Sequence, residues 1–369
     1  MVSEVPVIDG KFVNHDFVFE VDWKLNEIDF VKAMDENSKY FITKFGKSDN
    51  IAISVWTTPK RTKNGPYARV YKTLRHDGIK ITIIPVFHTG GINSGDQNLI
   101  QPGTVDLMTC LGVYAIIGVY VTGEGGKRRS QSKNAKNNLD NKKGKPIITK
   151  QKFDLTKICE QISEIIEKKP GIKDWNKQQI ILIPTLLEKS MESYGKMSKK
   201  LEIPLKSFKR IETRVKKSKE EDEGILEYYK KESMRAQHSE SSQDQKLEKV
   251  PGEKAKINIS YGETTKLYWT GDSVFINEEE EIVEILEAKN TSSAKFPSEA
   301  EALDAILKLQ FFKKCDFQYN GKKFEKKLIC YLSSSKKSSI EEFKIERKNI
   351  IDECNANDIE LKFNNEIIK

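Results

Sequence analysis

The sequence is poor in the residues that form covalent or metal cross-links. It contains five cysteines and four histidines among 369 residues. The cysteines are odd in number, lie far apart and include no C-x-x-C pair; they are Cys110, Cys159, Cys315, Cys330 and Cys354. Disulfide-framed domains are small and carry a dense, even set of cysteines, and structural zinc sites need closely spaced ligand pairs, so this pattern argues against both.

Long hydrophobic runs are also absent. The longest, at residues 107–121, holds about 15 residues and contains a glycine, whereas roughly 20 are needed to cross a bilayer. We therefore predict that this run forms buried core. The N-terminal segment includes acids and lacks the apolar stretch of a secretory signal, and we expect a cytoplasmic protein.

The composition is that of a folded, mildly basic chain. Hydrophobic residues make up 37% and charged residues 32%, and 63 Lys and Arg against 55 Asp and Glu give a net charge of +8. The length predicts two domains, each with its own core. The positive charge is compatible with a polyanionic partner but does not establish one.

The first half of the chain alternates between strand and helix patterns. Alternating β-branched and aromatic residues predict strands at 17–23 and 50–57. A strand at 79–87, a short helix at 105–111 and a buried strand at 113–121 then form an αβ unit. Residues 127–145 carry eight basic residues and one acid, which predicts a loop or arm.

Helical spacing dominates the middle of the chain. Asp154 is placed to cap a helix that ends at Pro170-Gly171. A second helix is predicted to begin at Pro184, and a third, basic helix has its apolar stripe between 205 and 215. A domain boundary is expected near residue 220.

The predicted fold is therefore mixed α/β (α+β). We expect an N-terminal α/β domain at residues 1–150, a helical connector at 151–220 and a C-terminal domain at 221–369. The C-terminal domain is predicted to have a mixed central sheet flanked by helices.

The most informative segment is residues 267–290, where two strand-like runs flank four consecutive glutamates. This pattern predicts a β-hairpin. With the turn centred between Glu279 and Glu280, Asp272 lies opposite Glu287. Because side chains alternate along a strand, Lys289 shares a face with Glu287 while Ala288 points to the other face.

Two carboxylates and an ammonium on one face predict a Mg²⁺ site. A hard dication takes oxygen ligands and is often held by one or two carboxylates, here Asp272 and Glu287. A bound metal lowers the pKa of water and neutralises charge on a phosphodiester. Lys289 is placed to orient the nucleophile and to stabilise the developing anion.

This arrangement resembles the PD-(D/E)xK nuclease motif. Gly271-Asp272 is followed after fourteen residues by Glu287-Ala288-Lys289-Asn290, with Thr270-Gly271 in place of the motif's proline. The resemblance implies a core of a helix, three antiparallel strands, a second helix and a further strand. Residues 227–240, 299–312 and 327–333 would be the first helix, the second helix and the last strand. The first helix often adds an acid, either Glu232 or Glu240, and we include Glu232 in the predicted catalytic set.

The whole chain also resembles bacterial type II restriction endonucleases, in residues 59–71, 81–85, 107–120 and 233–235. That resemblance implies sequence-specific, Mg²⁺-dependent cleavage of double-stranded DNA in host defence. It also implies a homodimer, and a cognate DNA methyltransferase as a genetic partner. Residues 1–150 would then recognise DNA, and residues 221–369 would cut it.

Two basic segments are candidate DNA contacts. Lys60, Arg61, Lys63 and Arg69 are interleaved with tyrosines, and arginines in such a loop could read guanine edges. Lys127, Arg128 and Arg129 begin the basic segment at 127–145 and could contact phosphates. Each segment could equally be an ordinary solvated surface.

Three alternatives remain open at this stage. An E-x-K triplet is common in a chain this rich in Lys and Glu, and Asp9 with Asp22-Trp23-Lys24 repeats the motif's spacing near the N-terminus. The substrate could instead be damaged DNA, single strands or RNA. The nuclease-like fold could also be a catalytically silent nucleic-acid-binding scaffold.

Overall fold

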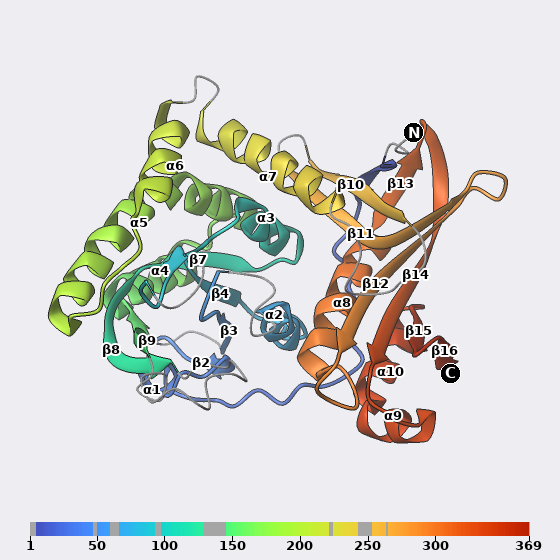
Figure 1. Ribbon diagram of the computed structural model, residues 1–369, viewed down its shortest axis with the longest axis horizontal. Helices are drawn as coiled ribbons and strands as arrows, with labels where there is room; N and C mark the ends of the chain where they lie inside the picture. Colours follow the sequence, from blue (N-terminus) through green and yellow to red (C-terminus); the bar gives the residue numbers. More distant parts are fainter. Residues whose placement is uncertain are drawn as a thin grey trace, which may run out of the picture.

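The computed structural model describes residues 5–46, 50–59, 66–92, 97–128, 145–220, 224–242, 253–262 and 265–368. The two larger sheets stand apart in the molecule; helices α5 and α6 lie on its left-hand side, and α7 runs across the top toward β10 and β11 (Figure 1). Helices α2 and α8 lie side by side between the sheets (Figure 1). The structure is therefore of the mixed α/β class that the sequence predicts.

The smaller sheet belongs to the first half of the chain. Its order is β2-β3-β4-β7, with β3, β4 and β7 parallel and β2 antiparallel. Its strands are β2 (Tyr40–Thr43), β3 (Ile51–Val55), β4 (Lys80–Pro85) and β7 (Tyr114–Gly118), and its crossover helices are α2 (Pro66–Leu74) and α3 (Pro102–Cys110). Every residue of β3 is buried, as expected for a parallel strand covered on both faces. The predicted αβ unit is confirmed.

Small elements surround this sheet. Helix α1 lies close to β2, and the ribbon of β8 and β9 continues from β7. These elements are α1 (Phe30–Asp35), β5 (Phe87–His88), β6 (Asn98–Leu99), β8 (Tyr120–Arg128) and β9 (Lys145–Phe153). Residues 129–144, most of the predicted basic arm, lie outside the described residues.

The helical region confirms one predicted start and corrects another. Asp154 accepts a hydrogen bond from the Lys157 N–H at 3.2 Å and caps α4 (Leu155–Lys168). Helix α5 (Ile172–Leu201) begins well before Pro184 and continues through it. Its early residues are fixed by the edge strand β7, because Asn176 accepts from the Ala115 N–H and Gln179 from the Ile117 N–H. These contacts outweigh the helix-breaking tendency of proline.

The third predicted helix is α6 (Lys209–Glu220), and it is followed by α7 (Ile225–Ser241). None of the helices in the described ranges combines the length and the apolar composition needed to cross a bilayer.

The larger sheet contains the C-terminal strands. Strands β10, β11 and β12 form an antiparallel meander, and β12 also pairs in parallel with β14. The order is β12-β11-β10-β1-β13-β14-β15-β16. The strands are β1 (Val7–Phe12), β10 (Glu253–Tyr261), β11 (Thr265–Asn277), β12 (Ile282–Thr291), β13 (Cys315–Tyr319), β14 (Lys322–Ser334), β15 (Glu360–Phe363) and β16 (Glu366–Ile368).

The N-terminal strand crosses the predicted domain division. β1 lies between β10 and β13 in the large sheet, parallel to β10 and antiparallel to β13. The first strand of the predicted N-terminal domain, residues 1–150, therefore belongs to the sheet of the C-terminal unit. Sequence proximity assigned β1 to the first domain, whereas backbone hydrogen bonding places it in the second.

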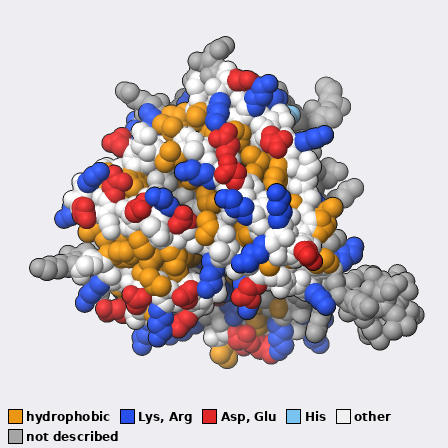
Figure 2. All heavy atoms as spheres, turned by 90° about the vertical axis from the view of Figure 1, so that its left-hand side faces the viewer, with side chains coloured by type: hydrophobic (Ala, Val, Ile, Leu, Met, Phe, Trp, Pro, Cys, Tyr) orange, Lys and Arg blue, Asp and Glu red, His pale blue; other side chains and the backbone are white. Residues whose placement is uncertain are grey.

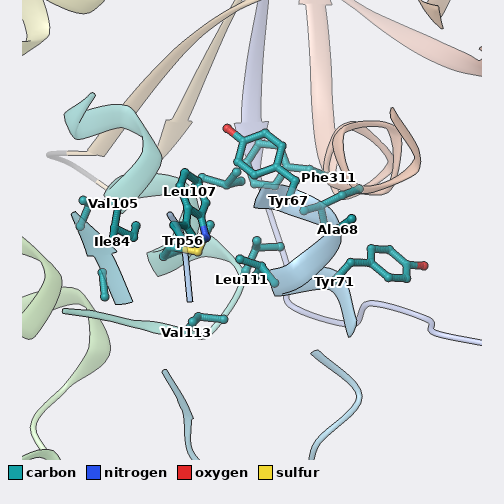
Figure 3. Close-up of a cluster of buried hydrophobic side chains, with 14 of the residues drawn as sticks. Trp56, Tyr67, Ala68, Tyr71, Ile84, Val105, Leu107, Leu111, Val113 and Phe311 are labelled. Carbon is teal, nitrogen blue, oxygen red and sulfur yellow. The ribbon is translucent and has the colours of Figure 1, made fainter. Parts of the chain in front are cut away.

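Helix α8 (Glu299–Lys313) joins the two units. Figure 3 shows Phe311 of α8 close to Tyr67 and Ala68 of α2, beside the buried Trp56. The Tyr71 hydroxyl donates to Glu353 at 2.7 Å and accepts from Gln310 at 3.0 Å. Glu353 lies on α10 (Lys348–Ala356), which follows α9 (Ile340–Glu346). Its carboxylate is fully buried and also accepts the Val21 N–H at 2.9 Å, so one acid holds three segments together.

A polar cavity of about 400 Å³ lies where α3, α5, α7 and the start of β11 meet. Asp106 of α3 lines it, together with several lysines of the neighbouring elements. Burial raises the pKa of Asp106 to about 7. The folded protein therefore holds a proton that the unfolded chain releases at lower pH.

Replacing Asp106 by asparagine should stabilise the protein at alkaline pH. An acid whose pKa is raised on folding loses stability as pH rises from its unfolded value of 3.8 through about 7. Allowing for partial solvent screening, the free energy of unfolding of Asp106→Asn should exceed that of the wild type by about 1–2 kcal/mol at pH near 8. Below pH near 4 the two proteins should differ little. Urea unfolding across this range measures the difference. Asp16→Asn, at an exposed loop position, is the control, and equal pH profiles for both variants would contradict the assignment.

Candidate active site

The hairpin register is the one the sequence predicts. β11 pairs with β12 from Ser273–Leu286 to Asn277–Ile282, so the next step along both strands sets Asp272 across from Glu287. In the turn, the Asn277 side chain accepts the N–H groups of Glu279 and Glu280, both at 3.1 Å. The turn therefore fixes the register from its own residues.

A bulge next to Gly271 turns Asp272 toward β12. The β10–β11 register shifts between Ala255–Gly271 and Glu253–Val274. A Cβ atom on Gly271 would lie 2.5 Å from Cγ2 of Val274, which is closer than real side chains approach. The Asp272 carboxylate then accepts the Ala288 N–H at 3.0 Å. Glycine at this position is thus needed for the bend that follows Thr270.

The two faces of β12 have different surroundings. Val283 and Ile285 belong to the main core, whereas Leu286 and Ala288 pack with Ile329 and Tyr331 of β14 in a separate small cluster. Glu287 and Lys289 alternate with Ala288 and therefore lie on the face covered by α8. The predicted orientation of all three residues is confirmed.

Glu287 is buried against a lysine that the sequence analysis did not identify. Its side chain is 2% exposed, and its Oε1 lies 2.6 Å from Nζ of Lys308 on α8. Lys308 also donates to the Thr270 carbonyl at 2.7 Å. Burial and, to a smaller extent, the Asp272 carboxylate raise the pKa of Glu287 to about 8, against the opposing effect of Lys308 and Lys289.

Lys289 lies with Asp272 and Glu287 and is also influenced by a further acid, Asp304. Burial alone would lower the pKa of Lys289, but the carboxylates of Glu287, Asp304 and Asp272 outweigh burial and raise it. Asp304 lies one helical turn before Lys308 on α8. The spacing of these two residues places them on one helix face, but only the packing of α8 on β12 shows which face meets the site.

The two candidate acids of α7 lie in different places. Glu232, the residue included in the predicted set, pairs with Arg214 of α6 at 3.2 Å. Glu240 lies in the field of Lys308 and contributes, after Glu287 and Asp272, to raising the pKa of that lysine against the effect of burial. The structure therefore places Glu232 against α6, whereas the alternative, Glu240, is exposed and influences Lys308 only through its charge.

The second copy of the motif near the N-terminus does not form a hairpin. Asp9 lies in β1 and accepts a hydrogen bond from Asn258 at 3.3 Å. Asp22, Trp23 and Lys24 lie outside the helices and strands, and the Trp23 ring is covered by the Lys72 ammonium at 4.3 Å. Asp9 and Trp23 thus have structural partners of their own.

The donor set at the candidate site suits a hard dication. Asp272 and Glu287 offer carboxylate oxygens within one group of charges. No group of three or more His, Cys, Asp or Glu in a metal-binding arrangement occurs within the described ranges. Mg²⁺ is commonly held by one or two carboxylates, with water and substrate phosphate completing its shell, so two acids are enough.

The residues predicted to contact DNA lie in different environments, and several lie outside the described part of the chain. Arg69 is 4% exposed and donates to the Val55 carbonyl at 2.6 Å, so it lies in the interior and not on a DNA-facing loop. Lys127 is exposed on β8. Lys60, Arg61, Lys63 and Arg129 lie outside the described residues, as does the side chain of Arg128.

One face of the molecule can be examined directly for charge. Figure 2 shows the side on which α5 and α6 lie, with Lys and Arg side chains interspersed among Asp, Glu and apolar groups. On α6, Lys219 pairs with Glu188 of α5 at 2.7 Å and Arg214 with Glu232 of α7. Part of the basic charge of α6 is thus engaged within the protein.

Comparison of the chain with protein-family models, with curated proteins and with solved structures found no match in any of the three. The functional interpretation therefore depends on the geometry and chemistry of the site.

Gly271→Ala should disturb the bend that positions Asp272. The added methyl group meets Val274 in a closely packed place, and overpacking of this kind costs about 1–3 kcal/mol. The double variant Gly271→Ala/Val274→Ala should recover part of that loss, because it removes the clashing group. Chemical unfolding measures both. Gly195→Ala is the control, since its methyl group meets nothing within 4 Å, and an equally harmless Gly271→Ala would contradict the bulge argument.

Proposed function

We propose that this protein is a Mg²⁺-dependent endonuclease that hydrolyses phosphodiester bonds of double-stranded DNA. The observation that supports this most directly is the convergence of Asp272, Glu287 and Lys289 on one face of the hairpin. Two acids can hold a metal ion that activates water and neutralises phosphate charge, and a neighbouring lysine can stabilise the negative charge that develops in phosphodiester hydrolysis.

The order of elements around the site supports the same proposal. Helix α7 precedes the meander β10–β11–β12, α8 follows it, and β14 then pairs in parallel with β12. This is the succession that the resemblance to PD-(D/E)xK nucleases implies. A restriction-endonuclease-like core is accordingly our proposal for the larger sheet and its helices.

Each side chain has a role that follows from its place. Asp272 and Glu287 would hold the Mg²⁺, which when bound supplies Lewis acidity toward the phosphate and lowers the pKa of water. Lys289 lies beside both acids and would orient the attacking water and stabilise the developing negative charge. Lys308 holds Glu287 in place from α8 and so acts as a positioning residue.

The more specific proposal is a type II restriction enzyme of the cytoplasm. It would act on a specific DNA sequence, as a homodimer, with a cognate methyltransferase that protects host DNA. A homodimer follows if the recognised sequence is palindromic, because two-fold symmetry of the site matches two-fold symmetry of the protein. Lys127, and the basic residues 60–63 and 128–129, are the proposed DNA contacts.

The first experiment is to incubate the purified protein with unmethylated phage DNA in Mg²⁺ and in EDTA. Discrete Mg²⁺-dependent fragments are expected. A smear would instead favour a nuclease without sequence specificity, such as one that acts on damaged or single-stranded DNA. The absence of cutting would favour RNA as substrate or a role in binding alone.

Glu287→Gln should reduce DNA cleavage by at least about 100-fold while DNA binding survives. The substitution keeps the side chain's size and removes a carboxylate oxygen that would bind the metal, a loss comparable to that of one key electrostatic group. Cleavage rate and gel-shift affinity measured together separate the two effects. Glu284→Gln on the same strand, whose carboxylate pairs with Lys327 at 3.0 Å, should cut at the wild-type rate. Wild-type cleavage by Glu287→Gln would refute the site.

Lys308→Met should impair cleavage by about 10–100-fold, the range typical for partners that orient metal ligands. Without the Lys308 ammonium, the Glu287 carboxylate loses its fixed position. The Mg²⁺ concentration for half-maximal cleavage should therefore rise, and calorimetry should show weaker Mg²⁺ binding. The control is Lys313→Met on the same helix, which pairs with Asp358 instead. Unchanged Mg²⁺ affinity in Lys308→Met would show that Lys308 does not position Glu287.

A further inference from the structure

A second buried charge, that of Arg69, lies beside the smaller sheet and away from the proposed nuclease site. Arg69 projects from α2 into the interior, and its only hydrogen bond within the described residues joins Nη1 to the Val55 carbonyl. Its Nε is buried and has no acceptor there. No Asp or Glu in the described ranges forms an ion pair with it. The guanidinium is thus a desolvated charge with one neutral partner.

Such an arrangement is costly unless another group compensates it. Arginine stays protonated in proteins because its pKa is above 12. A buried cation without a counter-charge costs several kcal/mol. Burial lowers the pKa of Arg69, and the other groups that influence it are the hydroxyls of Tyr120 and Tyr40, which are neutral at ordinary pH. Within the described residues, the charge therefore lacks a compensating anion.

Arg69 lines a small cavity at the carboxyl end of β3. Trp56 and Thr57, which follow β3, line it together with Tyr120, which follows β7. In open α/β sheets, ligands bind outside the carboxyl ends of the parallel strands. The indole N–H of Trp56, itself fully buried, also has no acceptor in the described part of the chain.

The charges around the cavity are predominantly positive. Lys39, Arg69 and Lys152 line it, against one acid, Asp35, which gives a balance of +2. Asp35 is already engaged, because its carboxylate pairs with Lys152 at 2.8 Å near the surface. Gln151, a further polar group in the lining, is also occupied, since it donates to the Thr89 carbonyl and accepts from Tyr194. The lining thus provides unused donors and surplus positive charge.

The size of the cavity limits what can bind. Its volume is about 40 Å³, which exceeds the minimum for one water molecule but is too small for a nucleotide. We propose that this cavity binds one small anion on Arg69, of the size of chloride or of the oxygen end of a phosphate group. A water molecule could accept from the same donors, but it would leave the charge uncompensated. This site is independent of the proposed nuclease activity.

The test is thermal unfolding at constant ionic strength, with sodium chloride replacing sodium gluconate, whose anion is too large for the cavity. The melting temperature of the wild-type protein should rise with chloride and saturate, by roughly 2–4 °C. Arg69→Met should show no such dependence. Arg75→Met, at an exposed arginine just after α2 that donates to the Glu20 carbonyl at 3.0 Å, should respond like the wild type.

Further measurements separate the source of the anion and guard against a variant that fails to fold. Stabilisation by phosphate but not by chloride would assign the cavity to the phosphate group of a larger molecule. Wild-type crystals soaked in bromide should show an anomalous peak within hydrogen-bonding distance of Arg69. A melting temperature independent of both anions, a chloride response without a bromide peak, or a response to the stabilising anion that is retained in Arg69→Met would overturn the proposal.

Discussion

The antiparallel pairing of β11 with β12 is the constraint on which the candidate site depends. A shift of one residue would move Glu287 and Lys289 to the opposite face of the sheet, where Leu286 and Ala288 now pack against Ile329 and Tyr331 of β14. The register is held at one end by the Asn277 turn and at the other by the hydrogen bond between Asp272 and the Ala288 N–H. The site is thus built on paired strands and not on a mobile loop.

Helix α8 gives that site its rigidity and its electrostatics. One part of the helix packs against α2 through Phe311 and Gln310, while Asp304 and Lys308 face the hairpin. The same helix therefore joins the two units and holds Glu287.

Burial changes the role of charged residues on both sides of the molecule. Glu287 and Arg69 are nearly inaccessible to water, and each needs a partner of opposite charge because the interior solvates ions poorly. Glu287 has Lys308 at 2.6 Å. Arg69 has no equivalent in the described residues, which is why the two sites lead to different inferences: a cation held by two acids in one case, and a small anion in the other.

The sequence by itself determined the local features. The alternation of residues 282–291, the four glutamates of the turn and the Asp154 cap of α4 are short-range patterns, and the structure has the elements they predict. The pairing of Asp272 with Glu287 was predictable because a hairpin's register follows from its turn. A strand pattern cannot show which helix covers it, so Lys308 and Asp304 were not found.

Tertiary structure decided everything that depends on contacts between distant segments. β1 joined the C-terminal sheet, α5 continued through Pro184 on the strength of its contacts with β7, and Arg69 turned inward from a segment whose composition suggests a surface loop. Sequence patterns report the preference of a residue for its neighbours along the chain. The environment of a charge, and hence its chemistry, is set by residues from other segments of the chain, because burial is a property of the whole packed molecule.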